Sequence, residues 1–268
     1  MKKKISITIE GSILKEVDLI VDHISIRNRS QAIEHLLGIA VGENRTAVIM
    51  AGGHEENIRI GNRYRPTVKI GQKSVVELAI EKLRESGFKS IYIIARQNVL
   101  TQIFNIIKDG SSFGVKINYV EEKESNGSAD SLKAIMGRIE SDFLIVYGDI
   151  LIGNISLEDI WNDHLKHNAV ATIMMTTSSK PSEKGTLKAE GNKVLAFTQK
   201  PKDSDIYLVF SPVMAASKEL LEYHGASLEK DIFPILAGRG LLNGYLSSEK
   251  ETHIHSLNDA KKAEKMLG

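Results

Sequence analysis

The sequence predicts an α/β fold for residues 44–268, preceded by a smaller strand–helix–helix unit at residues 1–43. Along the longer part, apolar runs typical of buried strands alternate with segments that repeat apolar residues at helical spacing. The first apolar run, 47–50, leads directly into Gly52 and Gly53, and a basic loop and a helix follow. That order of strand, glycine turn, basic loop and helix is typical of a site for polyphosphate.

The smaller unit begins with strict alternation of polar residues and isoleucine over 4–9, which predicts a strand with one polar and one apolar face. Apolar stripes at helical spacing follow over 13–21 and over 32–37. Asn28 is a good N-cap for the second helix, and Gln31 stands where a capping-box partner belongs. Three elements in about forty residues form a core that is too small to stabilise the unit by itself. Because the chain has no cysteine to supply a disulfide, we expect this unit to dimerise.

In the larger unit, each expected element is read from its own pattern. The strands are short apolar runs, and the run at 116–120 mixes polar and apolar residues as an edge strand does. The helices repeat apolar residues every three to four positions, and Gly87 ends the first of them. We expect strands at 47–50, 90–95, 116–120, 142–146 and 169–176, and helices at 74–83, 99–108 and 157–168.

Asp149 follows the expected strand at 142–146, so its carboxylate belongs at the carboxyl edge of a central strand, where open α/β sheets bind ligands. Mg²⁺ prefers one or two carboxylates together with phosphate oxygens and water. Asp149 is therefore the first candidate for a metal ligand. The alternative is an aspartate that only caps the following turn.

This order of elements resembles that of the sugar-phosphate nucleotidyltransferases. The resemblance implies a GT-A-like, Rossmann-like domain with a mixed, mostly parallel sheet, and an enzyme that uses Mg²⁺. A phosphorylated acceptor such as a sugar phosphate would attack the α-phosphate of a nucleoside triphosphate and release pyrophosphate. The matching stretches are AGG at 51–53, IGQKSVVELAIEKLRESG at 70–87, GSADSL at 127–132, GD at 148–149, KGTL at 184–187, KVLAFTQKP at 193–201 and SLEKDIFPILAGRGLLNGY at 227–245.

The resemblance also implies roles for individual residues. Arg65 stands near the family's loop lysine and would hold phosphate, Asp149 would hold the metal, and Lys200 would reach the sugar phosphate. His253 stands where the family usually has a second metal-binding aspartate, and His255 is expected to be an ordinary surface residue. The expected contacts are Ala51, Gly52, Gly53, Lys69, Gly127, Ser128 and Ala129 for the nucleotide, and Gly185 and Lys200 for the acceptor.

The smaller unit resembles the ribbon-helix-helix (Arc/MetJ-like) DNA-binding domains, in which strands of two chains pair and enter the major groove. The resemblance implies a homodimer or higher homo-oligomer that binds double-stranded DNA through residues 1–43. The outward strand residues would read base edges, and the start of the second helix would hold a backbone phosphate. The residues at those positions are Lys4, Ser6, Thr8, Asn28 and Arg29. The alternative is a dimerisation arm that never contacts DNA.

Several positions depart from the family pattern. After AGG the family usually continues with glycine, threonine and arginine, whereas this chain has His54 to Asn57. Gln199 replaces a glutamate, and Ile206 stands where a glycine would leave room for a sugar. These departures favour an alternative function, a catalytically degenerate sensor of a nucleotide or nucleotide sugar that regulates transcription.

The composition limits the partners, the cysteine chemistry and the membrane association that are expected of this chain. The formal net charge of +1 carries no chain-wide signal for a polyanionic partner. The absence of cysteine excludes disulfides and thiolate metal sites, and it is consistent with a cytoplasmic protein. The apolar runs are too short to cross a bilayer, and the first residues lack the apolar core of a signal peptide, so we expect no membrane partner.

Overall fold

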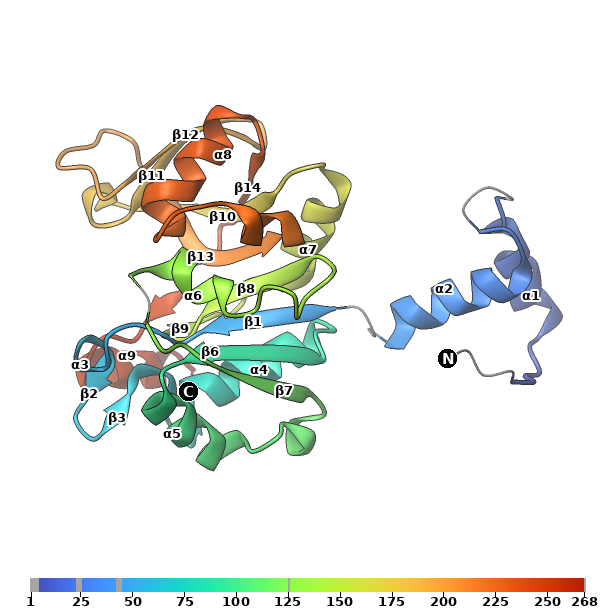
Figure 1. The fold of residues 1–268 in the computed structure, drawn as a ribbon, viewed down its shortest axis with the longest axis horizontal. Coiled ribbons are helices and arrows are strands. Elements are labelled where there is room, and N and C mark those ends of the chain that lie inside the picture. Colours follow the sequence, from blue (N-terminus) through green and yellow to red (C-terminus); the bar gives the residue numbers. More distant parts are fainter. Residues whose placement is uncertain (1–4, 23–25, 42–44, 125, 268) are drawn as a thin grey trace. The chain divides into compact units, whose positions relative to one another are not determined.

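The computed structural model describes residues 5–22, 26–41, 45–124 and 126–267. The chain divides into two compact units, Met1–Asn44 and Arg45–Gly268 (Figure 1). Lys4, one of the predicted base contacts, lies outside the described residues. Within the described part of the chain, no helix is both long and apolar enough to span a lipid bilayer.

The N-terminal unit holds both predicted helices, α1 (Gly11–Leu19) and α2 (Arg29–Val41), which pack against each other. Val17 of α1 and Ala32 of α2 are buried. Residues 5–10, which alternate as a strand does, are not paired as a strand in the single chain. A β-strand needs a hydrogen-bonded neighbour, so the predicted ribbon requires a second chain.

The start of α2 is held by side chains. The Asn28 Oδ1 accepts a hydrogen bond from the amide of Gln31 at 3.0 Å, which confirms the predicted N-cap. The Gln31 side chain accepts from the amide of Arg27 at 2.7 Å, one residue before the position that a capping box predicts. Arg29 donates two hydrogen bonds of 2.7 Å to the carboxylate of Asp18. Its guanidinium is therefore engaged within the unit instead of being free for a DNA phosphate.

The larger unit is built on one sheet. Its nine described strands are β1 (Thr46–Met50), β6 (Ser90–Ala95), β7 (Lys116–Glu121), β8 (Phe143–Tyr147), β10 (Ala171–Thr177), β11 (Gly185–Glu190), β12 (Lys193–Gln199), β13 (Leu208–Ala216) and β14 (Leu242–Leu246). They lie in the order β10-β14-β12-β11-β13-β8-β1-β6-β7 (Figure 1). The strands predicted from apolar runs are confirmed to within one or two residues, and β7 lies at the edge of the sheet as expected.

The sheet is mixed, as predicted, but it is not mostly parallel. β1 pairs in parallel with β6 and with β8, and β6 pairs in parallel with β7. In the other half, β8 with β13, β13 with β10 and β11, and β12 with β11 and β14 are antiparallel, and β10 with β14 is parallel. A short turn joins β11 to β12 and therefore makes that pair antiparallel. The apolar pattern of a strand does not reveal its direction.

Helices cover both faces of the sheet (Figure 1). Successive side chains of β1 point to opposite faces, so both faces have apolar side chains to cover. The helices are α4 (Val75–Glu85), α5 (Gln97–Ile107), α6 (Ser128–Lys133), α7 (Leu157–Lys166), α8 (Phe233–Gly238) and α9 (Leu257–Leu267). Ala47 and Ile49 belong to an apolar cluster that includes residues of α4, α5 and α7. Val48 and Met50 belong to a second cluster with residues of α6 and α8. The central strand is thus buried on both faces up to its last residue.

Short elements complete the unit. They are the helix α3 (Glu55–Ile58) and the strand pairs β2 (Arg59–Ile60) with β3 (Arg63–Tyr64), β4 (Lys69–Ile70) with β5 (Lys73–Ser74), and β9 (Ile150–Leu151) with β15 (Thr252–His253). The pair β9–β15 matters most for the site, since it joins the segment after β8 to the segment before α9.

Candidate functional site

The carboxyl ends of β1 and β8 form the floor of the candidate site. β1 continues into the glycine turn, defined as residues 51–53, and β8 continues into Gly148 and Asp149. The amide of Gly148 donates to the carbonyl of Met50 at 2.8 Å, so the two ends lie side by side. A Cβ at Gly148 would lie 2.9 Å from the Cβ of Ala51, which explains why glycine stands where the strand ends meet.

Two adjoining pockets lie over this floor. The first has a volume of about 330 Å³, and the second, of about 120 Å³, extends to Arg65 and Asp149. They share Met50, Gly52, Ile58 and Tyr147 as walls. Of the predicted residues, Gly52, Gly53, Gly127 and Ser128 line the first pocket, and Ala51, Gly52, Arg65 and Asp149 line the second. Their combined size is in the range of small-molecule sites.

The start of α6 forms one wall of the first pocket. The amides of Ala129 and Asp130 donate to the carbonyl of Ala226 at 2.9 and 3.1 Å. A Cβ at Gly127 would lie 2.7 Å from the same carbonyl oxygen, so a larger residue would push α6 away. Ala129 itself is buried in the core and lines neither pocket, and its contact with a nucleotide stays a prediction.

Glu229 supports this wall from behind and was not singled out by its sequence pattern. Its buried carboxylate accepts hydrogen bonds from the Oγ of Ser128 at 2.6 Å and from the hydroxyl of Tyr147. Burial, and then the charge of Glu229, raises the pKa of Tyr147 well above its ordinary value. Tyr147 is therefore a neutral hydroxyl that fixes the pocket wall.

Glu122 is a second carboxylate that sequence patterns did not single out. It is buried directly after β7, and its Oε1 accepts from the Oγ of Ser131 at 3.1 Å. Its Oε2 has no hydrogen-bond partner among the described residues, and a Cβ at Gly52 would lie 1.7 Å from it. A carboxylate one residue beyond a parallel strand is a signal that could have identified it.

Arg65 and Asp149 form an ion pair in the second pocket. The Arg65 Nη1 donates to the Asp149 Oδ2 at 2.9 Å, and its Nη2 donates to the carbonyl of Asn57 at 2.9 Å. Burial raises the pKa of Asp149, but a hydrogen bond from His255 and the neighbouring positive charges outweigh burial and hold the pKa below its ordinary value. The carboxylate is therefore ionised at neutral pH and can hold a cation.

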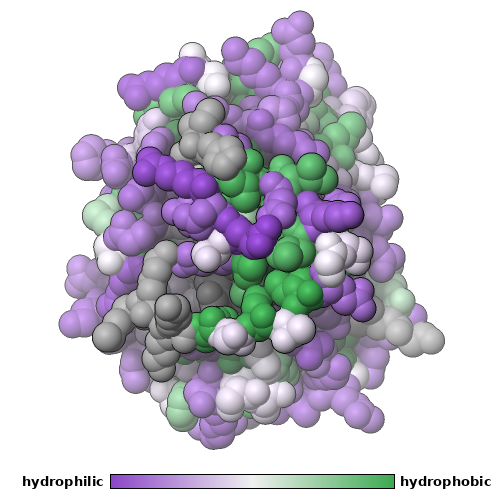
Figure 2. Space-filling model, turned by 90° about the vertical axis from the view of Figure 1, so that its right-hand side faces the viewer, coloured by the Kyte–Doolittle hydropathy of each residue, from purple (hydrophilic) through white to green (hydrophobic). Residues whose placement is uncertain are grey.

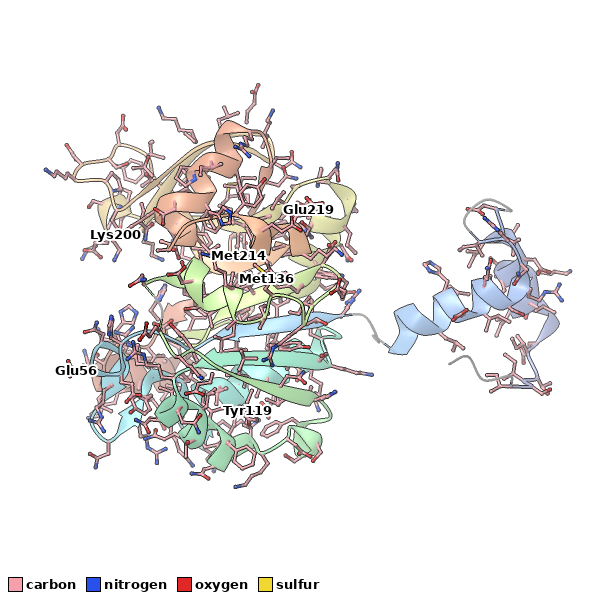
Figure 3. The ribbon with its side chains drawn as sticks, in the orientation of Figure 1. Glu56, Tyr119, Met136, Lys200, Met214 and Glu219 are labelled. Carbon is pink, nitrogen blue, oxygen red and sulfur yellow. The ribbon has the colours of Figure 1, made fainter. Side chains whose placement is uncertain are left out.

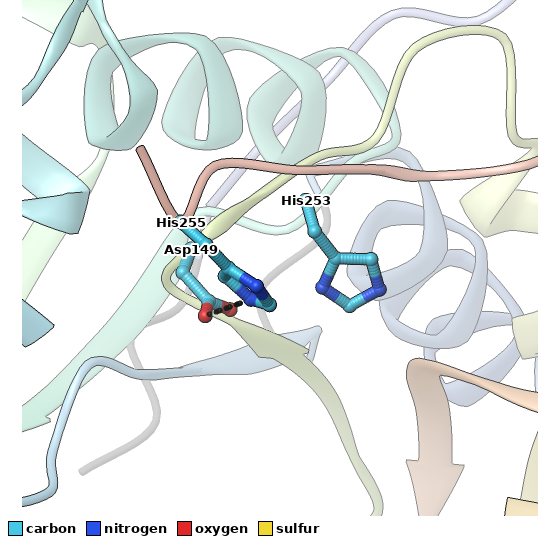
Figure 4. A group of neighbouring side chains, drawn as sticks. All are labelled: Asp149, His253 and His255. Carbon is cyan, nitrogen blue, oxygen red and sulfur yellow. Dashed lines mark ion pairs between the residues drawn. The ribbon is translucent and has the colours of Figure 1, made fainter. Parts of the chain in front are cut away.

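His253 and His255 both lie beside Asp149 (Figure 4). His255 is exposed, as expected, but its Nε2 lies 3.3 Å from the Asp149 Oδ2, so its side chain also borders the site. Alternate residues of an extended chain point to the same side, and Ile254 between the two histidines is buried. β15 ends at His253, and the amide of Ile254 then donates to the carbonyl of Asp149 at 2.8 Å.

Glu251 holds His253 in place. Its side chain is 0 % exposed, and its Oε1 pairs with the His253 Nε2 at 3.0 Å and with the Lys184 Nζ at 2.8 Å. Its Oε2 accepts from the Oγ of Ser211. Burial raises the pKa of Glu251, but these three hydrogen bonds outweigh burial and lower the pKa to about 2.

We expect the replacement Glu251→Gln to make the fold less sensitive to acid. A carboxyl whose pKa falls from 4.5 to about 2 on folding stabilises the native state above pH 4.5, and this contribution is lost as the pH falls towards 2. Between pH 5 and pH 3, urea unfolding of the original protein should lose about 2 kcal/mol more than that of the variant. The exposed replacement Glu140→Gln should behave like the original. Equal losses for the original and Glu251→Gln would contradict this account.

The predicted acceptor residues do not line the two pockets. Lys200 follows β12 with a φ of 45°, and its amide donates to the carbonyl of Lys184 at 3.0 Å. Figure 3 labels Lys200 in the half of the unit that holds β11 and β12, well separated from Glu56 of α3. A Cβ at Gly185 would lie 2.6 Å from the Gln199 Oε1, so Gly185 is packed against β12. The acceptor roles of Lys200 and Gly185 stay predictions.

Lys69 is placed in the hairpin of β4 and β5. Its Nζ donates to the carbonyl of Gln72 at 3.2 Å, and the hairpin packs against α9. Since Lys69 is exposed and lines neither pocket, this geometry does not support its predicted contact with the nucleotide.

The donors around Asp149 fit Mg²⁺ poorly. Asp149 supplies one carboxylate, and His253 and His255 supply imidazole nitrogens. Mg²⁺ prefers oxygen ligands, whereas imidazole suits transition metals such as zinc. Among the described residues of this cluster, the predicted Mg²⁺ site therefore rests on the carboxylate of Asp149 alone.

The chain matches a family of known proteins. Residues 46–245 match the family model described as nucleotidyl transferase. The chain is 26% identical over 212 residues to the mannose-1-phosphate guanyltransferase of Yarrowia lipolytica, which covers 74% of this chain and 57% of that protein. It is 25% identical over 218 residues to the mannose-1-phosphate guanylyltransferase catalytic subunit beta of Danio rerio, with coverage of 73% and 57%. The chain thus spans little more than half the length of these curated relatives.

A solved structure shares the fold. It is that of a Bacillus anthracis protein assigned as a glucose-1-phosphate thymidylyltransferase, with a TM-score of 0.72 and 16% identity over 83% of this chain and 94% of that one. This match confirms the predicted mixed α/β fold.

Proposed function

The chain belongs to the nucleotidyl transferase family, and from this membership we propose that it transfers a nucleoside monophosphate from a nucleoside triphosphate to a sugar phosphate. An oxygen of the acceptor phosphate attacks the α-phosphorus and forms the new P–O bond. The bond from the α-phosphorus to the bridging oxygen breaks, and pyrophosphate leaves with the electron pair. The observation that carries the proposal is the pair of pockets that runs from Gly127 across the glycine turn to Asp149.

The residues of the chain bind and align the substrates. The first pocket takes the nucleoside, and the main chain of the glycine turn approaches the phosphates closely because Gly52 and Gly53 carry no side chain. Arg65 lies in the second pocket and offsets negative charge at the α-phosphate. Catalysis of this kind rests on alignment and on stabilisation of charge in the transition state.

We infer that the nucleotide carries guanine. The relatives from Yarrowia lipolytica and Danio rerio are named as guanyltransferase and guanylyltransferase. Glu122 is compatible with the same choice. It lies buried behind the wall of the first pocket, where its Oε1 accepts from Ser131 of that wall and its Oε2 lacks a partner among the described residues, so a base that reaches it must pass Ser131. A carboxylate accepts two hydrogen bonds from the N1–H and the 2-amino group of guanine, and adenine offers no such pair of donors.

Pyrophosphate release tests this function. The full chain is incubated with each of the four nucleoside triphosphates, and with mannose 1-phosphate, glucose 1-phosphate or no acceptor, in Mg²⁺ and separately in Mn²⁺. We expect release that requires the acceptor and is at least tenfold faster with GTP than with ATP. If nucleotide or nucleotide sugar binds tightly and no pair of substrates yields pyrophosphate, the chain is a ligand sensor and the enzyme proposal is wrong.

We also propose that the N-terminal unit joins two copies of the chain and binds double-stranded DNA. The supporting observation is the set of apolar side chains that this unit leaves exposed in a single chain. Figure 2 shows hydrophobic side chains gathered among hydrophilic ones on one face of the molecule. Pairing of Ile5 and Ile7 with the same residues of a second copy covers part of this exposed apolar set, and Ser6 and Thr8 then face the groove. The exposed apolar residues of this unit are Ile5, Ile7, Ile13, Leu19 and Leu37.

Light scattering and DNA binding test the role of this unit. We expect the original chain to be at least dimeric and the double replacement of Ile5 and Ile7 by lysine to dissociate it. Selection from a pool of random duplexes should recover a preferred sequence, and replacement of Ser6 and Thr8 by alanine should remove that preference. A monomeric original chain, or a dimer that selects no sequence and binds no duplex at 50 mM salt, would contradict the proposal.

A further inference from the structure

We propose that Asp149, His253 and His255 form a binding site for a divalent transition metal ion of the zinc and cobalt class, in preference to Mg²⁺. The proposal deepens the proposed function. It rests on that function only for the phosphates beside the ion, because the second pocket, which would hold them, ends at Asp149.

The spacing of the three side chains suits one shared ion. One possible ligand atom from each of them lies within 4.8 Å of the other two. Donors that each stand about 2.1 Å from an ion are separated from one another by about 3 to 3.4 Å. The His255 Nε2 and the Asp149 Oδ2 are already 3.3 Å apart. The third donor, on His253, lies within 4.8 Å of the other two, so an ion shared by all three would draw these donors closer together.

A buried carboxylate sets the orientation of one imidazole. The Glu251 Oε1 pairs with the Nε2 of His253 at 3.0 Å, and Lys184 and Ser211 hold Glu251 in turn. The opposite ring nitrogen of His253 points toward His255 and Asp149 (Figure 4). Metal-binding histidines commonly donate their second N–H to a carboxylate, which fixes the ring and increases its basicity. This pairing is a second observation, independent of the spacing, that indicates a metal ligand.

The backbone holds the two arms of the site together. β15 pairs with β9, so that His253 lies opposite Ile150, one residue after Asp149. The amide of Ile254 donates to the carbonyl of Asp149 at 2.8 Å. The backbone that carries the three ligands is therefore in place before any ion arrives, and ligands on a fixed backbone discriminate between ions better than ligands on a loose one.

The charge at the site is balanced by Arg65 when no metal is bound. Its Nη1 lies 2.9 Å from the Asp149 Oδ2, the same oxygen that faces His255. An arriving ion displaces the guanidinium, which then is available to the phosphates in the second pocket. Metal binding and phosphate binding should accordingly favour each other.

Ion selectivity follows from the donor atoms. The affinity of two nitrogens and one carboxylate oxygen for first-row divalent ions rises from manganese through cobalt to copper and is somewhat lower for zinc. Mg²⁺ is hard, prefers oxygen and dehydrates reluctantly, so the imidazoles add little to its affinity. A cobalt ion in such a site also gives visible absorption bands that report its ligands.

Cobalt binding to the full chain, without any nucleotide, tests the proposal. The protein is dialysed against one equivalent of Co²⁺ in 5 mM Mg²⁺, bound metal is counted by mass spectrometry, and the visible spectrum is recorded. We expect one Co²⁺ per chain, displaced by Zn²⁺ and not by Mg²⁺. His253→Asn and His255→Asn should each weaken binding at least a hundredfold, and Glu251→Gln about tenfold. His224→Asn, which removes an exposed histidine outside this cluster, should bind like the original.

The outcomes separate this inference from the proposed function. Cobalt that binds no more tightly than Mg²⁺, or equally well to both histidine variants with intact circular dichroism spectra, overturns the metal site whatever the turnover. A Co²⁺ site with the expected variants in a chain that releases no pyrophosphate overturns the proposed function and leaves the metal site standing.

Discussion

Replacing Asp149 with asparagine should lower the rate of acceptor-dependent pyrophosphate release about a thousandfold. The side chain keeps its shape, but the charge that faces Arg65 and His255 is lost. Asp149 stands at the end of a buried strand, where the second pocket meets the two histidines, so a cation at this position depends on its carboxylate. Removal of one group that stabilises developing charge typically costs two to three powers of ten.

The measurement is kcat/KM with GTP and mannose 1-phosphate, accompanied by thermal unfolding of each variant. Asp109→Asn is a matched control, because Asp109 is exposed in the turn after α5 and lines neither pocket. The control should retain the original rate. A folded Asp149→Asn variant within threefold of the original rate would show that Asp149 takes no part in the reaction.

Gly127→Ala should weaken nucleotide binding about thirtyfold. The added Cβ would lie 2.7 Å from the carbonyl oxygen of Ala226 and 3.1 Å from its carbon, so backbone has to move. Inserting one methyl group where backbone has no room typically costs about 1 to 3 kcal/mol. The start of α6 would shift away from Ala226, and Ser128 would leave its place in the pocket wall.

Calorimetric titration with GTP measures this effect. Gly238→Ala serves as the control, since a Cβ there meets nothing within 4 Å and the residue has no left-handed backbone. The control should bind GTP like the original chain. An unchanged dissociation constant for Gly127→Ala would exclude the start of α6 from the nucleotide site.

Most of the fold could be predicted because its strands and helices differ in apolar spacing. The run at 90–95 reads as a buried strand and is β6, and the helix expected at 74–83 is α4, which Ser74 precedes as its N-cap. Strand direction could not be predicted in the same way. Antiparallel pairing in the half with β11 and β12 depends on turns and on contacts between distant segments, which spacing does not encode.

Gly52 and Asp149 could be assigned to the site because each stands in a motif directly after an expected strand, and Arg65 because it stands near the family's loop lysine; all three line the second pocket. Glu122 was missed because a single carboxylate after an edge strand belongs to no motif. The position of His255 beside Asp149 depends on the pairing of β15 with β9, two segments far apart in the sequence, which a local pattern does not encode. Lys69 was included because basic loop residues look alike in sequence, although only the fold decides which of them reaches the pocket.

The N-terminal unit shows a different limit. Its helices and the Asn28 cap follow from local pattern, and they form within one chain. A ribbon formed by two chains depends on strand pairing with a second chain, which the local pattern of one sequence does not predict. The exposed side chains of Ile5 and Ile7 favour such pairing, because a second strand would cover them.

The central claim is that a nucleoside triphosphate lies along the two pockets, and a crystal structure with a non-hydrolysable GTP analogue tests it most directly. We predict guanine between Gly127 and Glu122, with the phosphates against residues 51–53 and the α-phosphate beside Asp149. Analogue bound elsewhere on the chain, with both pockets closed by side chains and the Arg65–Asp149 ion pair unchanged, would contradict the account.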